Sequence, residues 1–309
     1  MLPETIRGVP DFVDRILVVD DASTDATVAR AQDVDPRVEV IQRARNGGVG
    51  AAVVTGYRHA IAESIDVTCV MNGDAQMDPA DLISLVAAVA RGECDYAKAN
   101  RVCTPDAKRV IPSSRYVGII VLSFLTKVAS GYWKIGDSQS GYTAVNLETL
   151  LELDLDGLYP RYGFPNDMLV HLNVGDRRVR EFPSRPIYGI GEESGMRLPK
   201  VIPTLLWLLI SGFWWRLKEK YLVRDFHPLV VFYAIGTLLL AAGFVLGAAE
   251  TGVRMAGSQI LSPAIVVVAL LVAGLWMTAL AMWLDQASNK GLSGRGRPTA
   301  REQATVSRV

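Results

Sequence analysis

The sequence predicts an α/β domain over residues 1–200, followed by a helical membrane hairpin over residues 228–285. Two observations lead to this prediction. In the first 200 residues, short β-branched runs alternate with turns and apolar-periodic segments, which is typical of a parallel sheet covered by helices. Residues 228–249 and 255–284 contain no charged side chain, and each is long enough to span about 30 Å of hydrocarbon, which takes roughly 20 helical residues.

The overall composition excludes several functional classes. The 309 residues include 32 Lys and Arg against 32 Asp and Glu, so the chain is no polyanion binder and nucleic acid is not an expected partner. Half of the residues are hydrophobic, which excludes disorder as the dominant state. The three cysteines form neither an even disulfide framework nor a CxxC pattern, and we interpret them as reduced thiols in a cytosolic domain.

Three strands are predicted in the α/β domain, over Ile16–Asp20, Val38–Gln42 and Val67–Met71. After the third strand, Asp78 can cap a helix that has Pro79 at its first position. The turn before this helix therefore follows the carboxyl end of a strand. Because open parallel sheets bind ligands at that edge, the polar residues at 20–25 and 72–78 are placed where chemistry is expected.

Two acidic clusters share this predicted edge, VVDDASTDAT at 18–27 and MNGDAQMDP at 71–79. Asp20 and Asp21 are adjacent carboxylates at a strand end, and their repulsion is unfavourable unless a positive group or a hydrogen-bond donor compensates it. Oxygen ligands on a second loop can hold a hard divalent cation. The alternatives are structural: Ser23 and its two neighbours as a helix cap, and 72–76 as a simple Asn-Gly turn.

Two further patterns do not indicate a ligand. The glycine turn at 45–50 lacks the third small residue of a dinucleotide fingerprint and is explained by a turn that opens a helix over 51–64. His59, His171 and His227 show no metal-binding spacing and are interpreted as surface or capping residues.

Four motifs, in order and spacing, resemble a known family: the run at 18–27, RNGGVGAAVVTG at 45–56, MNGDAQMDPADL at 71–82 and DSQSGYTA at 137–144. Together they are similar to the family 2 glycosyltransferases of the GT-A fold. More narrowly, the chain resembles the polyprenyl-phosphate glycosyltransferases related to dolichyl-phosphate mannose synthase, which carry a carboxyl-terminal membrane hairpin. The resemblance covers residues 4–200 by motif and the remainder by architecture.

The resemblance implies a nucleotide site and a metal site. The residues matched to the nucleotide are Asp20, Asp21, Ser23, Asn46 and Gly48, and those matched to a divalent cation, Mg²⁺ or Mn²⁺, are Asn72, Asp74 and Gln76. Asn72 stands where the family usually has Asp. An amide oxygen can coordinate but brings no charge, so we expect weaker metal binding that depends on Asp74, Gln76 and the substrate diphosphate.

The resemblance also implies an acceptor site and catalytic groups. Asp137, Ser140, Gly141 and Asn166 match the sugar and acceptor pocket, Asp167 matches a candidate base that acts with Asp74, and Ser194, Arg197, Lys200 and Arg115 match groups that hold an acceptor phosphate. Alternatives stay open at two places. Asn166 and Asp167 could be helix caps, and Arg197 and Lys200 could anchor the chain at a membrane surface.

The membrane part begins with residues 201–227. The Trp-rich run at 201–215 is too short to span a bilayer and is interpreted as an interfacial helix, with a buried soluble helix as the alternative. Gly236, Gly243 and Gly247 could let the two spans approach closely. Basic residues flank the hairpin on both sides, so the positive-inside rule places both termini in the cytoplasm, and residues 286–309 are expected to be a disordered basic tail.

The resembled family normally begins with an inner strand that carries Pro-x-Tyr-Asn-Glu. In this sequence, residues 4–12 match the helix after that strand, so we expect a sheet without it and a true start upstream of Met1. The predicted function is a metal-dependent, inverting transfer of a sugar from a nucleotide-diphosphate sugar to a polyprenyl phosphate at the bilayer. The rivals are transfer to a glycolipid or polysaccharide, and an inactive scaffold. The sequence leaves a homo-oligomer open.

Overall fold

The computed structural model of the protein describes residues 1–32, 34–188, 198–255 and 264–295. The chain divides into two compact units. The first comprises Met1–Trp214 together with the segment from Gly291 onward, and the second comprises Trp215–Lys290. These bounds differ from the predicted ones, because the first half of the 201–227 segment belongs to the first unit and the chain returns to that unit after the hairpin.

The amino-terminal part of the first unit holds a two-stranded parallel sheet. Strands β1 (Ile16–Asp20) and β2 (Val38–Gln42) have the bounds that their β-branched runs predict, and they pair in register from Ile16 opposite Val38 to Asp20 opposite Gln42. Three helices accompany them: α1 (Leu2–Gly8), α2 (Thr27–Gln32) and α3 (Val49–Ala62). Among the described residues no ladder joins this sheet to the next one, and the absence of an inner family strand stays a prediction.

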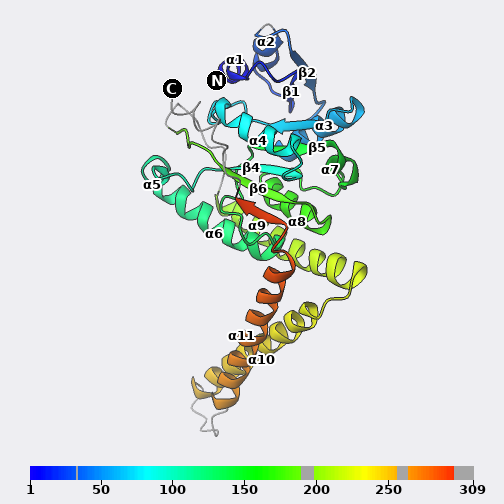
Figure 1. The fold of residues 1–309 in the computed structure, drawn as a ribbon. Coiled ribbons are helices and arrows are strands. Elements are labelled where there is room, and N and C mark those ends of the chain that lie inside the picture. The colour runs from blue at the N-terminus through cyan, green and yellow to red at the C-terminus, as the bar shows by residue number, and fades with distance from the viewer. Residues whose placement is uncertain (33, 189–197, 256–263, 296–309) are drawn as a thin grey trace. The chain divides into compact units, whose positions relative to one another are not determined.

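The second sheet has five strands in the order β3-β5-β4-β6-β7 (Figure 1). Its strands are β3 (Val67–Val70), β4 (Tyr96–Asn100), β5 (Thr143–Asn146), β6 (Val179–Pro183) and β7 (Ser293–Arg295). The sheet is mixed, whereas the sequence predicted a parallel one: β5 is antiparallel to both β3 and β4, while β4, β6 and β7 are parallel. The reason is that the segment between β4 and β5 returns the chain to the edge where β4 ended.

Helices cover both faces of this sheet. The helices between β3 and β6 are η1 (Pro79–Asp81), α4 (Leu82–Ala90), α5 (Ala107–Val110), α6 (Ser113–Ser130), α7 (Leu147–Glu152) and α8 (Phe164–Val174). Leu85 of α4 packs in one apolar cluster with Ala97 of β4, and Leu172 of α8 packs in another with Tyr96. The predicted cap is confirmed, because the Asp78 carboxylate accepts a hydrogen bond of 3.0 Å from the amide of Ala80.

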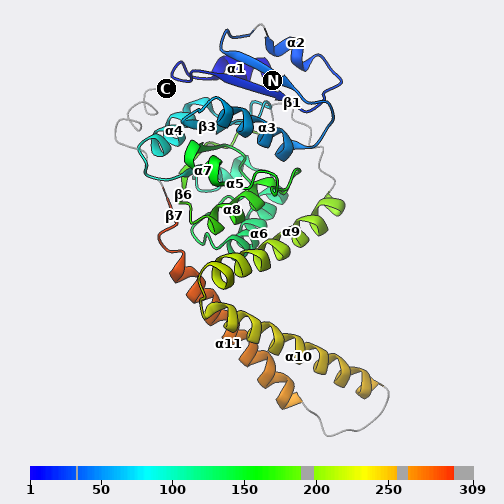
Figure 2. The same cartoon turned by 90° about the vertical axis from the view of Figure 1, so that its right-hand side faces the viewer.

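Two helices of the described part are long and apolar enough to cross a membrane. They are α10 (Leu229–Met255) and α11 (Ala264–Ser288), which lie side by side in the second unit (Figure 2). Their candidate spans have a mean hydropathy of 2.5, and only 22% and 11% of the apolar windows are buried. A core helix of a soluble protein is mostly buried, so these mostly exposed helices have the length, composition and exposure expected of membrane spans.

Glycines set the spacing of the two spans, as predicted. A Cβ on Gly236 would lie 2.9 Å from the amide nitrogen of Thr278, and one on Gly243 would lie 2.8 Å from the side chain of Leu271. Gly274 on the facing helix is equally confined, since a Cβ there would lie 2.9 Å from the amide nitrogen of Leu240. Only glycine permits backbones this close.

The second unit also contains a buried ion pair near the end of α11. Arg216 lies near the end of α9 (Leu198–Lys218), the helix that precedes the π-helical segment η2 (Glu219–Arg224). Its guanidinium donates to both carboxylate oxygens of Asp285, at 2.8 and 3.0 Å. The hydroxyl of Tyr221 donates to the same carboxylate at 3.1 Å. The bidentate pair fixes the end of α9 against the end of α11, and Tyr221 adds a contact from η2.

The predicted disordered tail is corrected in its first part. Helix α11 continues to Ser288, and β7 then pairs with β6 from Ser293 opposite Val179 to Arg295 opposite Glu181. A three-residue Ser-Gly-Arg strand has no β-branched signal and forms because the edge of β6 offers partners for its backbone. Residues 296–309 lie outside the described residues.

Candidate active site

A pocket opens at one edge of the five-stranded sheet. It is lined by Asn72, Gln76, Met77, Arg101, Ser140, Tyr142 and Ser184. These residues follow the carboxyl ends of β3, β4 and β6 or precede the amino end of β5. Since β5 is antiparallel to its neighbours, all four ends meet at the same edge. The pocket is therefore at the edge where sheets of this class bind ligands.

The turn after β3 forms one wall of the pocket. The carboxylate of Asp74 accepts a hydrogen bond of 3.0 Å from the amide of Gln76, and Ala75 between them has a left-handed φ of 58°. The end of the turn is held in place by Tyr142, whose hydroxyl donates to the carbonyl of Asp78 at 3.0 Å. A non-glycine residue with positive φ is uncommon, and such residues cluster at binding sites.

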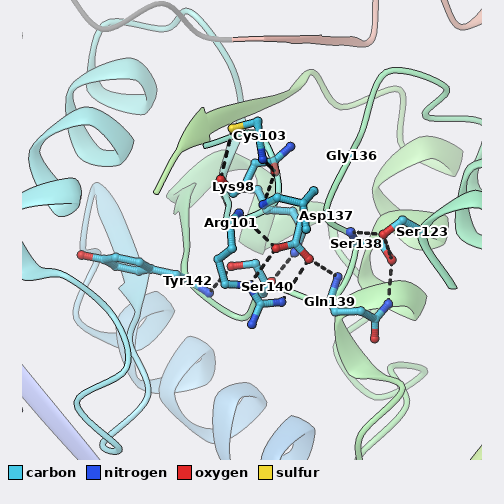
Figure 3. Close-up of polar contacts among 12 residues, drawn as sticks. Lys98, Arg101, Cys103, Ser123, Gly136, Asp137, Ser138, Gln139, Ser140 and Tyr142 are labelled. Carbon is cyan, nitrogen blue, oxygen red and sulfur yellow. Dashed lines mark hydrogen bonds and ion pairs between the residues drawn. The ribbon is translucent and has the colours of Figure 1, made fainter. Parts of the chain in front are cut away.

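Arg101 also lines the pocket and is anchored by Asp137, as the dashed lines in Figure 3 show. Its Nε donates to Asp137 at 2.7 Å and its Nη2 at 3.1 Å, and the Asp137 side chain is fully buried. Burial opposes ionisation of Asp137, but the neighbouring Arg101 outweighs it and lowers the pKa of the carboxyl. Arg101 is a lining residue of the pocket and Asp137 is its buried partner, and the role of Asp137 in the sugar pocket stays a prediction.

A second buried cation supports the loop before β5. Lys98 on β4 is completely buried, and its ammonium donates to the carbonyl of Ser140. Glu181 on β6 accepts from the amides of Gly136 and Asp137 at 2.7 and 2.8 Å. Burial raises the pKa of Glu181, although these amides and the nearby Asn100 oppose the rise. The buried side of the 136–142 loop is thus fixed by two cations and two carboxylates, namely Lys98, Arg101, Asp137 and Glu181.

Burial also changes the pKa of Lys98. Desolvation lowers it from 10.5 to about 8, against the opposing attraction of Asp137 and Glu181, while Arg101 adds to the lowering. Close packing leaves the loop little freedom, since a Cβ on Gly136 would lie 2.6 Å from the side-chain nitrogen of Asn100. The geometry of Ser140 in the pocket therefore depends on groups that a ligand does not touch.

The predicted nucleotide residues form a separate hydrogen-bonded cluster. Asp21 accepts from the amides of Gly47 and Gly48 at 3.0 and 2.7 Å and pairs with Arg43. Burial would raise the pKa of Asp21, but the two amides and then Arg43 lower it overall. The structure thus joins the end of β1 to the glycine turn.

The other four nucleotide candidates are Asp20, Ser23, Asn46 and Gly48. The carboxylate of Asp20 accepts from the amide of Ser23 at 3.2 Å, and Asp25 accepts from the amide of Thr27 at 3.1 Å, where α2 begins. Asn46 is exposed beside the glycine turn. Gly48 has a φ of 98°, and a Cβ there would lie 2.8 Å from the carbonyl of Pro160, so the position requires glycine. Their contact with a nucleotide stays a prediction.

Asn166 and Asp167 lie in the first turn of α8 and are both buried. The Asn166 side chain accepts from the hydroxyl of Thr126 at 2.8 Å and from the amide group of Gln139, so it links α8, α6 and the 136–142 loop. Asp167 accepts from the amide of Tyr159 at 2.7 Å and faces His171 at 3.7 Å. Burial raises the pKa of Asp167 despite the nearby imidazole. A role as base stays a prediction.

The predicted phosphate-binding residues are only partly described. Ser194 and Arg197 lie outside the described residues, and Lys200 is described by its backbone alone, in the first turn of α9. Arg115 lies over the ring of Tyr188, 5.6 Å from its centroid. Gly141 faces the turn after β3, since a Cβ on it would lie 3.5 Å from the side-chain oxygen of Asn72.

The proposed metal ligands offer oxygen atoms, which a hard cation prefers, but only one of the three side chains, Asp74, carries a negative charge. In the described part of the chain no group of three His, Cys, Asp or Glu side chains could hold a metal ion. Asn72 and Gln76 line the pocket with Asp74 between them, and the side-chain nitrogen of Gln76 is buried without a hydrogen-bond partner. The unpaired nitrogen of Gln76 is a hydrogen-bond donor, so it indicates an acceptor in the pocket, such as a phosphate oxygen. The side-chain oxygens of Asn72, Asp74 and Gln76 suit Mg²⁺ or Mn²⁺ when a diphosphate supplies the remaining charge.

Arg101, Lys98 and Glu181 are functional candidates that the sequence analysis missed. The available signal was the alternation of Tyr96, Lys98 and Asn100 with alanines, which places polar side chains on one face of a strand that ends at the site.

Comparison with known proteins gives consistent matches. The profile of the family described as "Glycosyl transferase family 2" matches residues 1–152. The undecaprenyl-phosphate mannosyltransferase of Micrococcus luteus is 33% identical over 190 residues, which cover 59% of this chain and 76% of that protein. The UDP-N-acetylglucosamine–dolichyl-phosphate N-acetylglucosaminyltransferase of Methanococcus voltae is 26% identical over 190 residues, covering 57% and 75%.

A solved structure is similar in fold. Glucosyl-3-phosphoglycerate synthase from Mycobacterium tuberculosis, in complex with Mn²⁺, UDP and glucosyl-3-phosphoglycerate, matches with a TM-score of 0.52 at 19% identity. The match covers 68% of this chain and 74% of that one. At this identity the likeness shows a shared fold and nothing of the substrate.

Proposed function

The chain belongs to glycosyltransferase family 2 and has the GT-A fold, and on this premise we propose that it transfers a sugar from a nucleoside-diphosphate sugar to a polyprenyl phosphate, with inversion, at a membrane. The observation that carries the proposal is the presence, in one chain, of the pocket around Arg101 and two mostly exposed apolar helices. The relatives from Micrococcus luteus and Methanococcus voltae are named for lipid phosphate acceptors, which supports the same acceptor class here.

The proposed reaction is a single displacement. A phosphate oxygen of the lipid forms a bond to the anomeric carbon, while the bond from that carbon to the nucleoside diphosphate breaks and the diphosphate leaves with the electron pair. Attack on the face opposite the leaving group inverts the configuration. Because a lipid phosphate is already largely anionic at neutral pH, correct placement matters more than a strong general base.

The main contribution of the pocket to the proposed reaction is a positive charge held at a fixed position. The guanidinium of Arg101, held by Asp137, is a fixed cation that would stabilise negative charge on a diphosphate at the carboxyl edge of the sheet. Asn72, Asp74 and Gln76 would hold a divalent cation, which when bound supplies Lewis-acid stabilisation of the departing diphosphate. Ser140 and Gly141 would line the sugar side of the pocket, and Arg115 would meet the acceptor phosphate.

The experiment is a transfer assay with membranes that contain the full chain. Labelled UDP-glucose, UDP-N-acetylglucosamine and GDP-mannose are each incubated with polyprenyl phosphate and Mg²⁺ or Mn²⁺. Asp74→Ala is compared with Asp156→Ala, which removes an exposed carboxylate paired with Arg58 on the surface. We expect a lipid-linked product from one donor with the wild type and the control, and a loss of at least about 100-fold with Asp74→Ala.

The outcomes separate the rivals. Equal product from Asp74→Ala contradicts the metal assignment, and product on a glycolipid or polysaccharide but not on polyprenyl phosphate contradicts the acceptor. Absence of product from all three donors, with a folded protein, contradicts the proposal and favours a scaffold.

We also propose that both termini lie in the cytoplasm, because basic residues flank the hairpin on both sides. Fusions of a fluorescent protein or alkaline phosphatase at the carboxyl terminus test this orientation. Phosphatase activity with a dark fluorescent fusion would contradict it.

A further inference from the structure

Four ionisable side chains meet beside the pocket, and they differ in how far they reach its surface. They are Lys98, Arg101, Asp137 and Glu181, the first three of which are labelled in Figure 3. Lys98 and the Asp137 side chain are 0% exposed and Glu181 is 2% exposed. The side chain of Arg101 is 26% exposed and lines the pocket. A ligand in the pocket therefore meets the charge of Arg101 directly and the other three charges only through the protein.

The charges of this cluster balance in two pairs. The guanidinium of Arg101 donates to both carboxylate oxygens of Asp137, and its backbone amide donates to the same carboxylate at 3.2 Å. The second carboxylate, Glu181, accepts three hydrogen bonds of 2.7–2.8 Å from N–H groups, which favour its ionised form. The ammonium of Lys98 is attracted by both carboxylates. It is therefore the positive charge that remains to balance Glu181.

The balance matters for an anion in the pocket. Without the charge of Lys98, the cluster would hold two carboxylates against one guanidinium and would carry a net negative charge. Buried charges are screened much less than exposed ones, so this negative charge would weaken the attraction of Arg101 for a phosphate. Lys98 also acts on the wall of the pocket itself, because its ammonium donates to the carbonyl of Ser140, a lining residue.

We propose that Lys98 is a positioning residue for the phosphate-bearing ligand of the pocket, and that its buried charge balances Glu181 so that Arg101 keeps its attraction for a phosphate. Lys98 acts through Arg101 and Ser140 and does not touch the ligand. The inference rests on the proposed function, because the ligand is either the diphosphate of the donor or the lipid phosphate of the acceptor.

A dependence on pH follows from the position of Lys98. Desolvation lowers the pKa of its ammonium to about 8, and Arg101 adds to the lowering, while Asp137 and Glu181 oppose it. A phosphate bound beside the cluster adds negative charge and so favours the protonated amine. By linkage, binding near pH 8 takes up a proton, and the affinity for the phosphate falls as the pH rises above 8.

The test measures binding of UDP, GDP and farnesyl phosphate to the purified full chain in detergent with Mg²⁺. Calorimetric titrations between pH 7 and pH 9.5 give the dissociation constants, and titrations at pH 8 in two buffers of different ionisation enthalpy give the proton uptake. For the ligand that meets Arg101, we expect the dissociation constant of the wild type to rise at least about threefold across this range, with proton uptake at pH 8. The ligand that shows this behaviour tells whether the diphosphate or the lipid phosphate lies beside Arg101.

Two variants complete the test. Lys98→Met should bind this ligand more weakly at pH 7 and show neither the pH dependence nor the proton uptake. Lys108→Met removes an exposed lysine of α5 and should behave like the wild type. A lysine that only held the carbonyl of Ser140 in place would leave no proton uptake on binding.

The outcomes are distinct. Binding to the wild type that is independent of pH would overturn the inference, and so would proton uptake that persists in Lys98→Met. If Lys98→Met does not fold, the pH dependence and proton uptake of the wild type decide the inference on their own. Failure of all three ligands to bind the wild type at pH 7 would contradict the proposed function as well, whereas binding without pH dependence leaves the proposed function intact.

Discussion

Replacement of Lys98 by methionine tests whether a buried ammonium controls the stability of the catalytic unit. Lys98 is completely buried, donates to the carbonyl of Ser140, and lies near the carboxylates of Asp137 and Glu181 and the guanidinium of Arg101. Lys98→Met keeps most of the side-chain volume but removes the titratable group. The variant therefore isolates the pH dependence that Lys98 causes.

The expected magnitude follows from the pKa of Lys98, which is lowered from 10.5 to about 8, mainly by desolvation. Below pH 8 the amine is protonated in both the folded and the unfolded chain, so the full penalty of the buried charge is present. As the pH rises from 8 toward 10.5, the folded chain loses this proton while the unfolded chain keeps it, and the free energy of unfolding rises. The complete shift corresponds to about 3 kcal/mol, and between pH 7 and pH 9.5 about 2 kcal/mol of it is gained.

The assay is thermal unfolding of the purified full chain in detergent, followed through the transition of the catalytic unit at several values of pH between 7 and 9.5. A change of about 2 kcal/mol corresponds to about 4–8 °C in a unit of this size. We expect the melting temperature of the wild type, relative to Lys98→Met, to rise by that amount across the range. Lys108→Met removes an exposed lysine and should show no such trend. A difference between wild type and Lys98→Met that is constant with pH would falsify the reasoning, because it would mean that Lys98 does not titrate in this window.

Two further predictions concern the pocket and the spans. Arg101→Lys keeps the charge but loses the bidentate contact with Asp137. Because hydrogen bonds between charged groups are worth about 1.5–3 kcal/mol, initial rates of sugar transfer should fall about 10- to 100-fold. Unchanged rates would contradict a role for the fixed guanidinium. Gly274→Val should force the spans apart, because even a Cβ there would lie 2.9 Å from the amide nitrogen of Leu240. The readout is disulfide formation between cysteines introduced at Gly247 and Val267, since a Cβ on Gly247 would lie 3.3 Å from the side chain of Val267. Crosslinking as efficient as with Gly274 intact would refute the close approach.

Local signals in the sequence predicted the elements that need no distant partner. The β-branched runs gave the bounds of β1 and β2, and the Asp78 cap was read correctly because its acceptor and donor are two residues apart. The apolar length of the two spans and the role of Gly236 between them followed from composition alone.

The elements that were not predicted depend on partners far along the chain. Strand β4 carries Lys98 and Asn100, which no strand propensity favours, and they are accommodated only because Asp137 and Glu181 arrive from other elements. The reversed direction of β5 depends on the path of the whole segment after Asn100. For the same reason the sequence did not indicate Arg101, which lines the pocket and is held by Asp137 from a distant loop.

The pairing of β7 with β6 makes the hairpin an insertion within the catalytic fold rather than an appendage to it. A soluble fragment cut before Leu229 would lose β7 as well as the spans, and it would leave the edge of β6 open to intermolecular strand addition. Excision of residues 215–290, with a short Gly-Ser bridge from Trp214 to Gly291, keeps that edge covered and is the more promising route to a catalytic unit that stays monodisperse in water.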